Sequence, residues 1–217
     1  MNDYFAVADR YAIRRLTADD AADIAAVHIR VWRETYPGLM AQAALDALDV
    51  ERSTVTWREI LGGDDSPRVV GAIERATGAL AGWITVGQAR DEDAPAPTEL
   101  WVLNLAREHQ GTGVAQELMR LELADRPAYL WVVEGNERAI AFYRRHGFDI
   151  DGVRREQDDE GNRDLRMTRP TTVKYVTLVA YRGRHERLHR CRLIPRQRRG
   201  RRCHHPEHRT QRLAEAL

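Results

Sequence analysis

The sequence predicts an α/β fold built on a central mixed β-sheet. Residues 100–105 form an apolar, strand-like run, and after a short glycine-bearing turn a helix begins at Val114. A second such unit follows, with a strand at 129–133 and a helix at 136–147. A strand–helix–strand unit implies parallel strands with a right-handed crossover, whereas hairpin signals such as 76–78 imply antiparallel neighbours. Both kinds of pairing are therefore expected in one α/β sandwich.

The first half of the chain is predicted to contain one strand, helices and a hairpin. Thr17 is a suitable N-cap, and apolar residues then recur at helical spacing. Gly62-Gly63 is suited to end a second helical region. The elements expected are a strand at 11–16, a helix after Thr17, a helical region at 41–61, and strands at 69–74 and 80–86.

The second half is predicted to alternate strands and helices. An acidic, proline-bearing segment at 91–97 is expected to be a solvated connection. Asn136 is a good N-cap and Gly147 a good residue just beyond the helix end. The elements expected are a strand at 100–105, a helix from 114 to about 124, a strand at 129–133, a helix at 136–147, and strands from 148 and at 164–168, joined by a turn at 158–162.

Charge divides the chain of 217 residues near Pro170. Residues 1–170 carry a net charge of −9 and residues 171–217 one of +10, which together give the +1 of the whole chain. We therefore expect a domain at 1–170, with ample core, and a basic Arg/His-rich extension at 171–217. The composition of the extension favours disorder, except that 172–181 could form a strand.

Several classes of protein are disfavoured. No run of about 18 apolar residues exists and the N-terminus lacks the pattern of a signal peptide, so we expect a cytoplasmic protein without membrane contact. The Cys/His-rich stretch at 203–208 has no standard zinc spacing, so no metal site is expected. The two cysteines lie beyond Pro170, and neither Ser53 nor Ser66 is in a nucleophile-elbow pattern. A covalent Ser or Cys intermediate is therefore not expected.

The glycine-bearing turn before Val114 predicts an anion site. Gly111 and Gly113 remove side chains where backbone N–H groups are still unpaired, at the positive end of a helix. A P-loop would need Lys-Ser/Thr after the second glycine, and Lys174 is the only lysine in the chain. A dinucleotide fingerprint would need a third glycine, where Gln116 stands. A tight turn without a ligand is the alternative.

Two motifs resemble those of the GCN5-related N-acetyltransferases. Gln110-x-x-Gly113-x-Ala115 is similar to the loop that binds the acyl-CoA pyrophosphate, and residues 136–148 resemble the family's Asn-x-x-Ala-x-x-Phe-Tyr-x-x-x-Gly-Phe helix, 26 residues later. The resemblance covers about residues 1–169. The chain departs from it at Arg107, where many members have proline, and at Ala115, where glycine is commoner.

The resemblance implies a donor and the residues that hold it. The donor would be acetyl-CoA, the fold would be the family's sandwich with a partly parallel sheet, and Tyr143 would lie near the CoA sulfur. Asn136 would bind the pantetheine arm, and backbone groups of Leu103 and Leu105 would meet the acetyl and pantetheine portions. The pyrophosphate would be held by Gln110, Gly111, Thr112, Gly113, Val114 and Ala115.

Acetyl transfer to an amine needs a base, because an amine with a pKa near 10 is mostly ammonium at neutral pH. Glu99 lies at a position similar to that of a glutamate that acts as the base in some family members, and Glu134 is the second candidate for the base. The alternative for both residues is a surface carboxylate without a catalytic role. Proton transfer from a tyrosine to a thiolate is unfavourable, because the two pKa values differ by about 1.5 units, or about 2 kcal/mol of free energy. Tyr143 is therefore expected to stabilise the thiolate mainly through a hydrogen bond.

The predicted function is direct acetyl transfer from acetyl-CoA to a primary amine of a small molecule or a protein. The charge of residues 1–170 favours a cationic acceptor, and a homodimer is left open. The rival interpretation is a nucleic-acid-binding protein that uses its basic extension, with the preceding domain as a scaffold.

Overall fold

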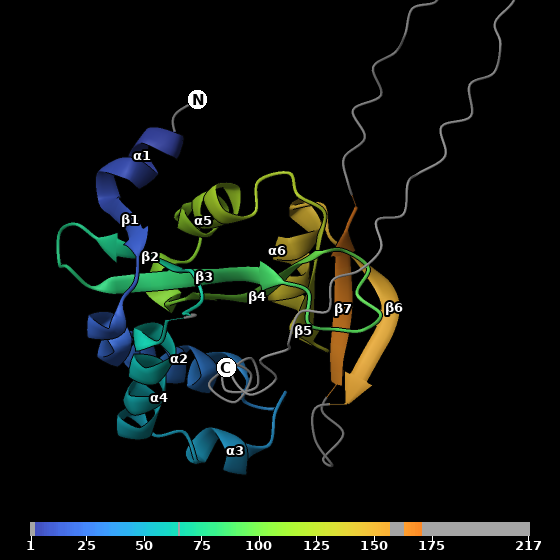
Figure 1. Cartoon of the computed structure of the whole chain (residues 1–217), viewed down its shortest axis with the longest axis horizontal. Helices are drawn as coiled ribbons and strands as arrows, with labels where there is room; N and C mark the ends of the chain where they lie inside the picture. The colour runs from blue at the N-terminus through green and yellow to red at the C-terminus, as the bar shows by residue number, and fades with distance from the viewer. Residues whose placement is uncertain (1–2, 65, 157–162, 171–217) are drawn as a thin grey trace, which may run out of the picture.

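The computed structural model describes residues 3–64, 66–156 and 163–170, and its strands form one mixed sheet in the order β1-β2-β3-β4-β5-β7-β6 (Figure 1). The strands are β1 Tyr11–Arg15, β2 Val69–Glu74, β3 Leu80–Gln88, β4 Thr98–Leu105, β5 Ala128–Val133, β6 Asp149–Glu156 and β7 Arg163–Arg169. The predicted α/β class with a partly parallel sheet is confirmed, because β4 and β5 pair in parallel and the other neighbours are antiparallel.

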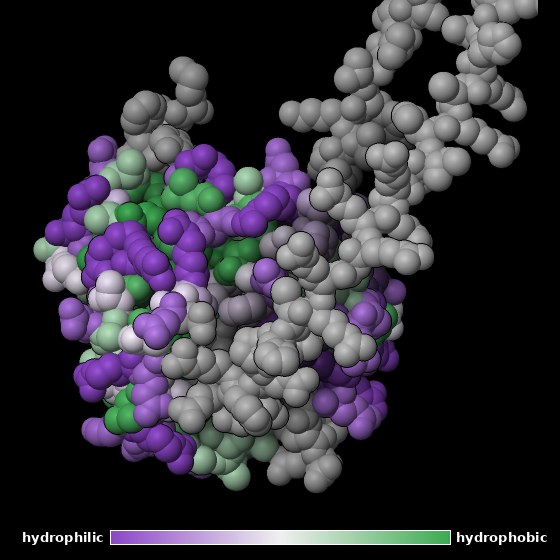
Figure 2. Space-filling model, viewed as in Figure 1, coloured by the Kyte–Doolittle hydropathy of each residue, from purple (hydrophilic) through white to green (hydrophobic). Residues whose placement is uncertain are grey.

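Helices cover both faces of the sheet. They are α1 Asp3–Arg10, α2 Ala21–Thr35, α3 Gln42–Asp46, α4 Val50–Gly62, α5 Val114–Glu122 and α6 Glu137–Arg145. α1, α5 and α6 share one apolar core, centred on buried residues such as Val114, Leu118 and Ile140. α2 and α4 share the other core, around Trp57 and Trp83. In the space-filling view, hydrophobic residues show between hydrophilic ones on the described surface (Figure 2).

Two segments differ from the sequence-based expectation. α1 was not predicted, although it packs Val7 into the core beside β1 and α5. The helical region expected at 41–61 is two helices, because Asp49 adopts an extended backbone and accepts a hydrogen bond from the Arg52 N–H, which starts α4 afresh. The predicted turn at 158–162 and the strand at 172–181 lie outside the described residues.

β4 and β5 pair over only two residues before they separate. The parallel register joins Glu99 to Tyr129 and Leu100 to Leu130, and no further pair follows. On the other side of β4, Thr85 pairs with Val102 and Val86 with Leu100, so Trp101 is an extra residue without a partner in β3. This bulge lies where the two parallel strands part, which opens the sheet at the carboxyl ends of β4 and β5.

Among the described residues, no helix has the length and apolar character needed to span a membrane.

Candidate active site

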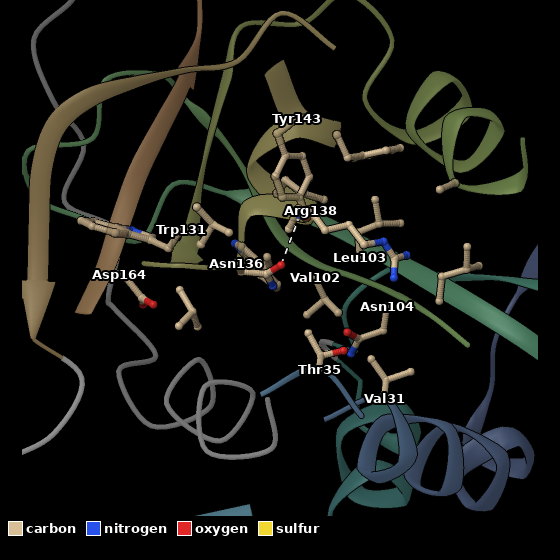
Figure 3. A pocket seen from close by; sticks show the side chains of 18 of the residues that line it. Val31, Thr35, Val102, Leu103, Asn104, Trp131, Asn136, Arg138, Tyr143 and Asp164 are labelled. Carbon is tan, nitrogen blue, oxygen red and sulfur yellow. Dashed lines mark hydrogen bonds between the residues drawn. The ribbon is translucent and has the colours of Figure 1, made fainter. Parts of the chain in front are cut away.

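A pocket of about 1350 Å³ lies where β4 and β5 separate (Figure 3). Its walls come from the end of α2, from β4 and β5, from the turn before α5 and from α6. In the close-up, Tyr143 and Asn136 lie on the α6 side, whereas Trp131 and Asp164 lie together on the side of β5 and β7. The pocket therefore joins the turn predicted to bind an anion to a second region built by the far half of the sheet.

The free edge of β4 presents backbone groups to this pocket. The Ala106 N–H donates to the Ala81 carbonyl of β3 at 2.9 Å. Because residues of an antiparallel strand point their backbone groups alternately toward and away from the neighbouring strand, Asn104 also bonds to β3. Leu103 and Leu105 point their backbone groups away from β3. Consistently, the Leu105 carbonyl accepts a hydrogen bond from Gln110 Nε2 at 3.2 Å. Since β5 has diverged here, the N–H and carbonyl of Leu103 and the N–H of Leu105 are available to a ligand.

The turn before α5 has the geometry of an anion cradle. Gly111 and Gly113 have φ values of +77° and +88°, a region that favours glycine. Backbone N–H groups from Gly111 to Gln116 donate to none of the described residues, and the helix dipole places positive potential there. A Cβ added to Gly111 would meet nothing within 4 Å, so the turn is open on that side. These features are compatible with a phosphate group, and the phosphate site stays a prediction.

A residue from β1 supports the turn from behind. The Tyr11 hydroxyl hydrogen-bonds to His109 Nδ1 at 3.0 Å and donates to Thr112 Oγ1 at 3.3 Å. Thr112 Oγ1 also donates to the His109 carbonyl at 2.7 Å. Tyr11 and His109 are both buried. No local pattern in the sequence predicts this contact, because Tyr11 and the turn are far apart along the chain.

The N-terminus of α6 brings an amide and a phenol to the pocket. Asn136 Oδ1 caps the helix by accepting from the Ala139 N–H at 3.2 Å, which leaves Nδ2 as a donor. Tyr143 lies one to two turns further along the same helix. Burial raises the pKa of the Tyr143 phenol above its usual value, and the neighbouring Tyr36 acts in the same direction. Tyr143 therefore remains a neutral hydrogen-bond donor at ordinary pH.

Glu99 lies in the pocket wall with its carboxylate already held by two side chains. Arg90 approaches it with Nη2 at 2.6 Å from Oε1 and Nε at 3.0 Å from Oε2. The Tyr129 hydroxyl donates to Oε2 at 2.9 Å, and the Arg90 backbone N–H lies 3.1 Å from the same atom. Oε1 has one such partner and is the oxygen with spare capacity.

Glu134, the second candidate for the base, lies outside the pocket lining. Its side chain is 38% exposed and its Oε1 lies 3.4 Å from Arg154 Nη2, so it is a surface carboxylate paired across to β6.

The other predicted site residues divide into a lining group and a supporting group. The lining group is Leu103, Leu105, Gln110, Gly111, Ala115, Asn136 and Tyr143. Thr112, Gly113 and Val114 are not in the lining: Thr112 ties the turn to His109, and the Val114 side chain is fully buried in the core. These three residues could offer only backbone groups to a ligand.

Side chains that the sequence analysis did not assign to the site also line the pocket. Trp131 lies in β5, Asp164 lies in β7, and Tyr36 directly follows the end of α2. Burial, together with the Asp164 carboxylate, raises the pKa of Tyr36 to about 12. The sequence contains a local signal only for Tyr36, because Trp32, Tyr36 and Trp57 supply more aromatic side chains than the two predicted helices of this region need for packing. Of that trio Trp32 lines the pocket, whereas Trp57 is wholly buried in the core.

The segment at 91–97 is a connection without buried residues, as expected, and two of its carboxylates also bind the sheet. The Asp91 carboxylate accepts a hydrogen bond from Trp131 Nε1 at 2.8 Å, and the Asp93 carboxylate lies 2.9 Å from Arg166 Nη1. These contacts fix the segment against β5 and β7, beside the pocket.

Known proteins that are similar to this chain are N-acetyltransferases. The model of the Acetyltransferase (GNAT) family matches residues 29–148. The uncharacterized N-acetyltransferase YuaI of Bacillus subtilis is 26% identical over 167 residues, which cover 70% of this chain and 93% of that protein. The uncharacterized N-acetyltransferase Rv2669 of Mycobacterium tuberculosis is 30% identical over 142 residues, which cover 62% of this chain and 86% of that protein.

Solved structures share the fold. The PaiA N-acetyltransferase of Thermoplasma acidophilum, solved with coenzyme A, is 20% identical with a TM-score of 0.53; the match covers 74% of this chain and 98% of that one. A histone acetyltransferase HPA2-related acetyltransferase of Corynebacterium glutamicum is 19% identical with a TM-score of 0.56, covering 77% and 99%.

Proposed function

We propose that this chain, which belongs to the acetyltransferase (GNAT) family, transfers an acetyl group from acetyl-CoA directly to a primary amine. The family and its named N-acetyltransferase relatives make the chain an acetyl-CoA-dependent acetyltransferase. The proposal concerns the acceptor and the residues that act. The observation that carries it is one pocket that contains the glycine turn, the free edge of β4 and Tyr143.

The donor would be held mainly by backbone groups. The unpaired N–H groups of residues 111–116 would bind the pyrophosphate, with Gln110 fixing the turn to Leu105. The free edge at Leu103 and Leu105 would pair with amide groups of the pantetheine arm, and Asn136 Nδ2 would donate to one of its carbonyls. A Leu103 or Leu105 N–H would also stabilise the oxygen of the reacting acetyl group.

The transfer would proceed in one addition–elimination sequence. The amine, having lost its ammonium proton, forms the N–C bond at the acetyl carbon. The C–S bond then breaks, the electron pair leaves with sulfur as the thiolate, and the nitrogen loses its second proton to water. Residues 1–170 contain no cysteine, and Ser53 and Ser66 are absent from the pocket lining. A covalent acyl-enzyme is therefore unnecessary.

Two side chains would manage charge and protons. Tyr143, kept neutral by burial, would donate a hydrogen bond to the departing thiolate. Glu99 would accept the ammonium proton through a water molecule at Oε1, because Oε2 already has three hydrogen-bond partners. Protonation would weaken its ion pair with Arg90, so this step would depend on the rearrangement of that pair.

The experiment is a screen of the purified full chain with acetyl-CoA over small amines, amino acids and lysine peptides, measuring CoA thiol release and product mass. We expect a mass gain of one acetyl group on at least one amine class. The Tyr143→Phe variant, run beside it, should lose about 10- to 100-fold in kcat, because a hydrogen bond to a charged group is worth about 1.5–3 kcal/mol.

Two outcomes would contradict the proposal. Thiol release without any acetylated amine would refute the acceptor class, and Tyr143→Phe at the wild-type rate would remove the role of the phenol. The rival nucleic-acid interpretation rests on residues 171–217, which lie outside the described residues.

A further inference from the structure

A buried histidine lies directly before the glycine turn. His109 is the last residue of the short 3₁₀-helix Arg107–His109, and Gln110 and the turn follow it. Its side chain is buried. Imidazole is the side chain that ordinarily changes charge between about pH 5 and pH 8. A titratable group therefore lies behind the surface that would hold the pyrophosphate of the donor.

The hydrogen bonds around His109 assign one proton to Nδ1. The Tyr11 hydroxyl donates its single hydrogen to Thr112 Oγ1 at 3.3 Å, and Thr112 Oγ1 donates its own to the His109 carbonyl at 2.7 Å. The Tyr11 oxygen lies 3.0 Å from Nδ1 and is left to accept from it. Since Nδ1 is the donor in this arrangement, Nε2 is the nitrogen that can gain or lose a proton.

Two carboxylates, two arginines and one phenol surround this imidazole. Glu74 Oε1 of β2 lies 4.0 Å from Nδ1, and Arg10 Nη2 approaches the same oxygen at 2.9 Å. Glu108, the preceding residue, is bound by Arg30 of α2 at 3.0 Å. The ring of Tyr11 meets the imidazole edge-on, with 5.6 Å between ring centres. Each carboxylate thus has an arginine partner, so the charges around the imidazole nearly cancel.

Both carboxylates interact electrostatically with His109. The hydrogen bond from Arg10 is the main cause that lowers the pKa of Glu74, and His109 acts in the same direction. A hydrogen bond from its own backbone is the main cause that lowers the pKa of Glu108, and both Arg30 and His109 add to it. Such coupling is mutual, so the carboxylates favour a charge on the imidazole, whereas burial opposes it. A further negative charge nearby would shift this balance toward the imidazolium.

A bound donor would bring that charge to the front of the turn. The backbone N–H groups of residues 111–116 donate to none of the described residues and would face the pyrophosphate, which stays ionised throughout the imidazole range. Thr112 connects the two sides, because it belongs to the turn and bonds to the His109 carbonyl behind it. Binding of an anion and binding of a proton on opposite sides of one turn are therefore expected to be coupled.

We propose that His109 is a positioning residue whose protonation is coupled to donor binding. Its neutral imidazole holds the Tyr11–Thr112 contact behind the turn, and Nε2 takes a proton from solvent when the pyrophosphate binds in front; no covalent bond changes in the donor. This inference rests on the donor site of the proposed function. Because the bound anion favours the charged imidazole, donor affinity rises as the pH falls through the imidazole range. It levels off where His109 is charged in both the free and the bound state.

Calorimetric titration of the full chain measures this proton directly. The ligand is dephospho-CoA, because the 3′-phosphate of CoA itself titrates near about pH 6. Titrations at pH 6.5 in two buffers of different ionisation enthalpy give the number of protons taken up. We expect about half a proton per bound ligand. Between pH 8 and pH 5.5 the Kd should fall about five- to tenfold, at the low end of typical coupling between two binding events.

His109→Asn separates the proton from the packing. The amide can donate to the Tyr11 oxygen from the position of Nδ1, but it cannot gain a proton. It should therefore abolish the proton uptake and flatten the pH dependence of the Kd. His146→Asn is the matched control, because His146 Nδ1 also hydrogen-bonds to one oxygen, the Phe142 carbonyl at 2.8 Å, and His146 lies outside the described pocket lining. This control should take up protons as the wild type does.

The outcomes distinguish this inference from the proposed function. Binding of dephospho-CoA to the wild type without proton uptake would overturn the inference, and that measurement needs no variant that could fail to fold. Uptake that persists in His109→Asn, or that is lost equally in His146→Asn, would overturn it as well and leave the donor site in place. The titrations contain no acceptor, so failure of the amine screen does not affect them. Dephospho-CoA that does not bind at all would remove the donor site and the inference together.

Discussion

At the scale of single residues, Glu99 has a structural role in the pocket wall beside the catalytic role proposed for it. Its side chain is 2% exposed, and a buried charge is costly unless it is paired. Arg90 and Tyr129 supply that pairing, and the same contacts hold the backbone at Arg90 and Asp91 beside the pocket. A catalytic role for Glu99 therefore has to be separated from its role in positioning this wall.

Glu99→Gln tests the base directly. The amide cannot accept the ammonium proton, so kcat should fall about 10²- to 10⁴-fold at pH 7 and recover partly at high pH, where more acceptor is already neutral. The measurement is the pH dependence of kcat, with the KM for acetyl-CoA as a check on the pocket. Glu134→Gln, outside the pocket lining, is the matched control and should leave kcat unchanged. If the pH dependence of kcat were the same for both variants, Glu99 would not be the base, and a chain of water molecules would accept the ammonium proton instead.

At the scale of secondary-structure elements, the turn before α5 depends on contacts from two other elements. Tyr11 of β1 holds His109 and Thr112, and Val7 of α1 lies 3.1 Å from the position of a Cβ added to Gly113. The turn is thus fixed from behind while its outer side, at Gly111, is open. A rigid cradle loses little conformational entropy when it binds a ligand.

Gly111→Ala and Gly78→Ala form a matched pair. Both glycines have positive φ, +77° and +73°, and neither added Cβ meets an atom within 4 Å, but Gly78 lies in the β2–β3 hairpin. Each variant should lose about 1–2 kcal/mol of unfolding free energy through backbone strain. Only Gly111→Ala should also raise the Kd for acetyl-CoA, by about tenfold. Urea denaturation and calorimetric titration measure the two effects, and an equal Kd in both variants would show that the turn does not hold the donor.

At the scale of the whole molecule, the pocket extends through the gap between β4 and β5, and the proposed donor site lies on the side of α5 and α6. The gap between β4 and β5 joins a basic side, backed by α5 and α6, to an acidic and aromatic side next to α2 and β7. Every lining residue that the structure describes lies between positions 31 and 164.

Removal of residues 171–217 should therefore leave acetyl transfer intact. We expect a chain that ends at Pro170 to retain the kcat and the acetyl-CoA Kd of the full chain within about twofold, because it keeps every lining residue that the structure describes. Steady-state kinetics and titration of both chains provide the comparison. A large loss of activity would place part of the machinery in the extension, and a salt-dependent loss of DNA or RNA affinity would support the rival interpretation.

What the sequence determined by itself is local. Periodicity and capping predicted most of the helices and strands, because backbone conformation depends on residues a few positions apart. The glycine turn predicted an anion site, and only the resemblance of this turn and the Asn136 helix to the family's motifs implied acetyl-CoA as the donor. Tertiary structure decided the rest. That β5 leaves β4 after Leu100, that Tyr11 supports the turn, and that Trp131, Asp164 and Tyr36 meet in one pocket follow from strand order and packing. Such contacts join distant segments, and no local pattern encodes them.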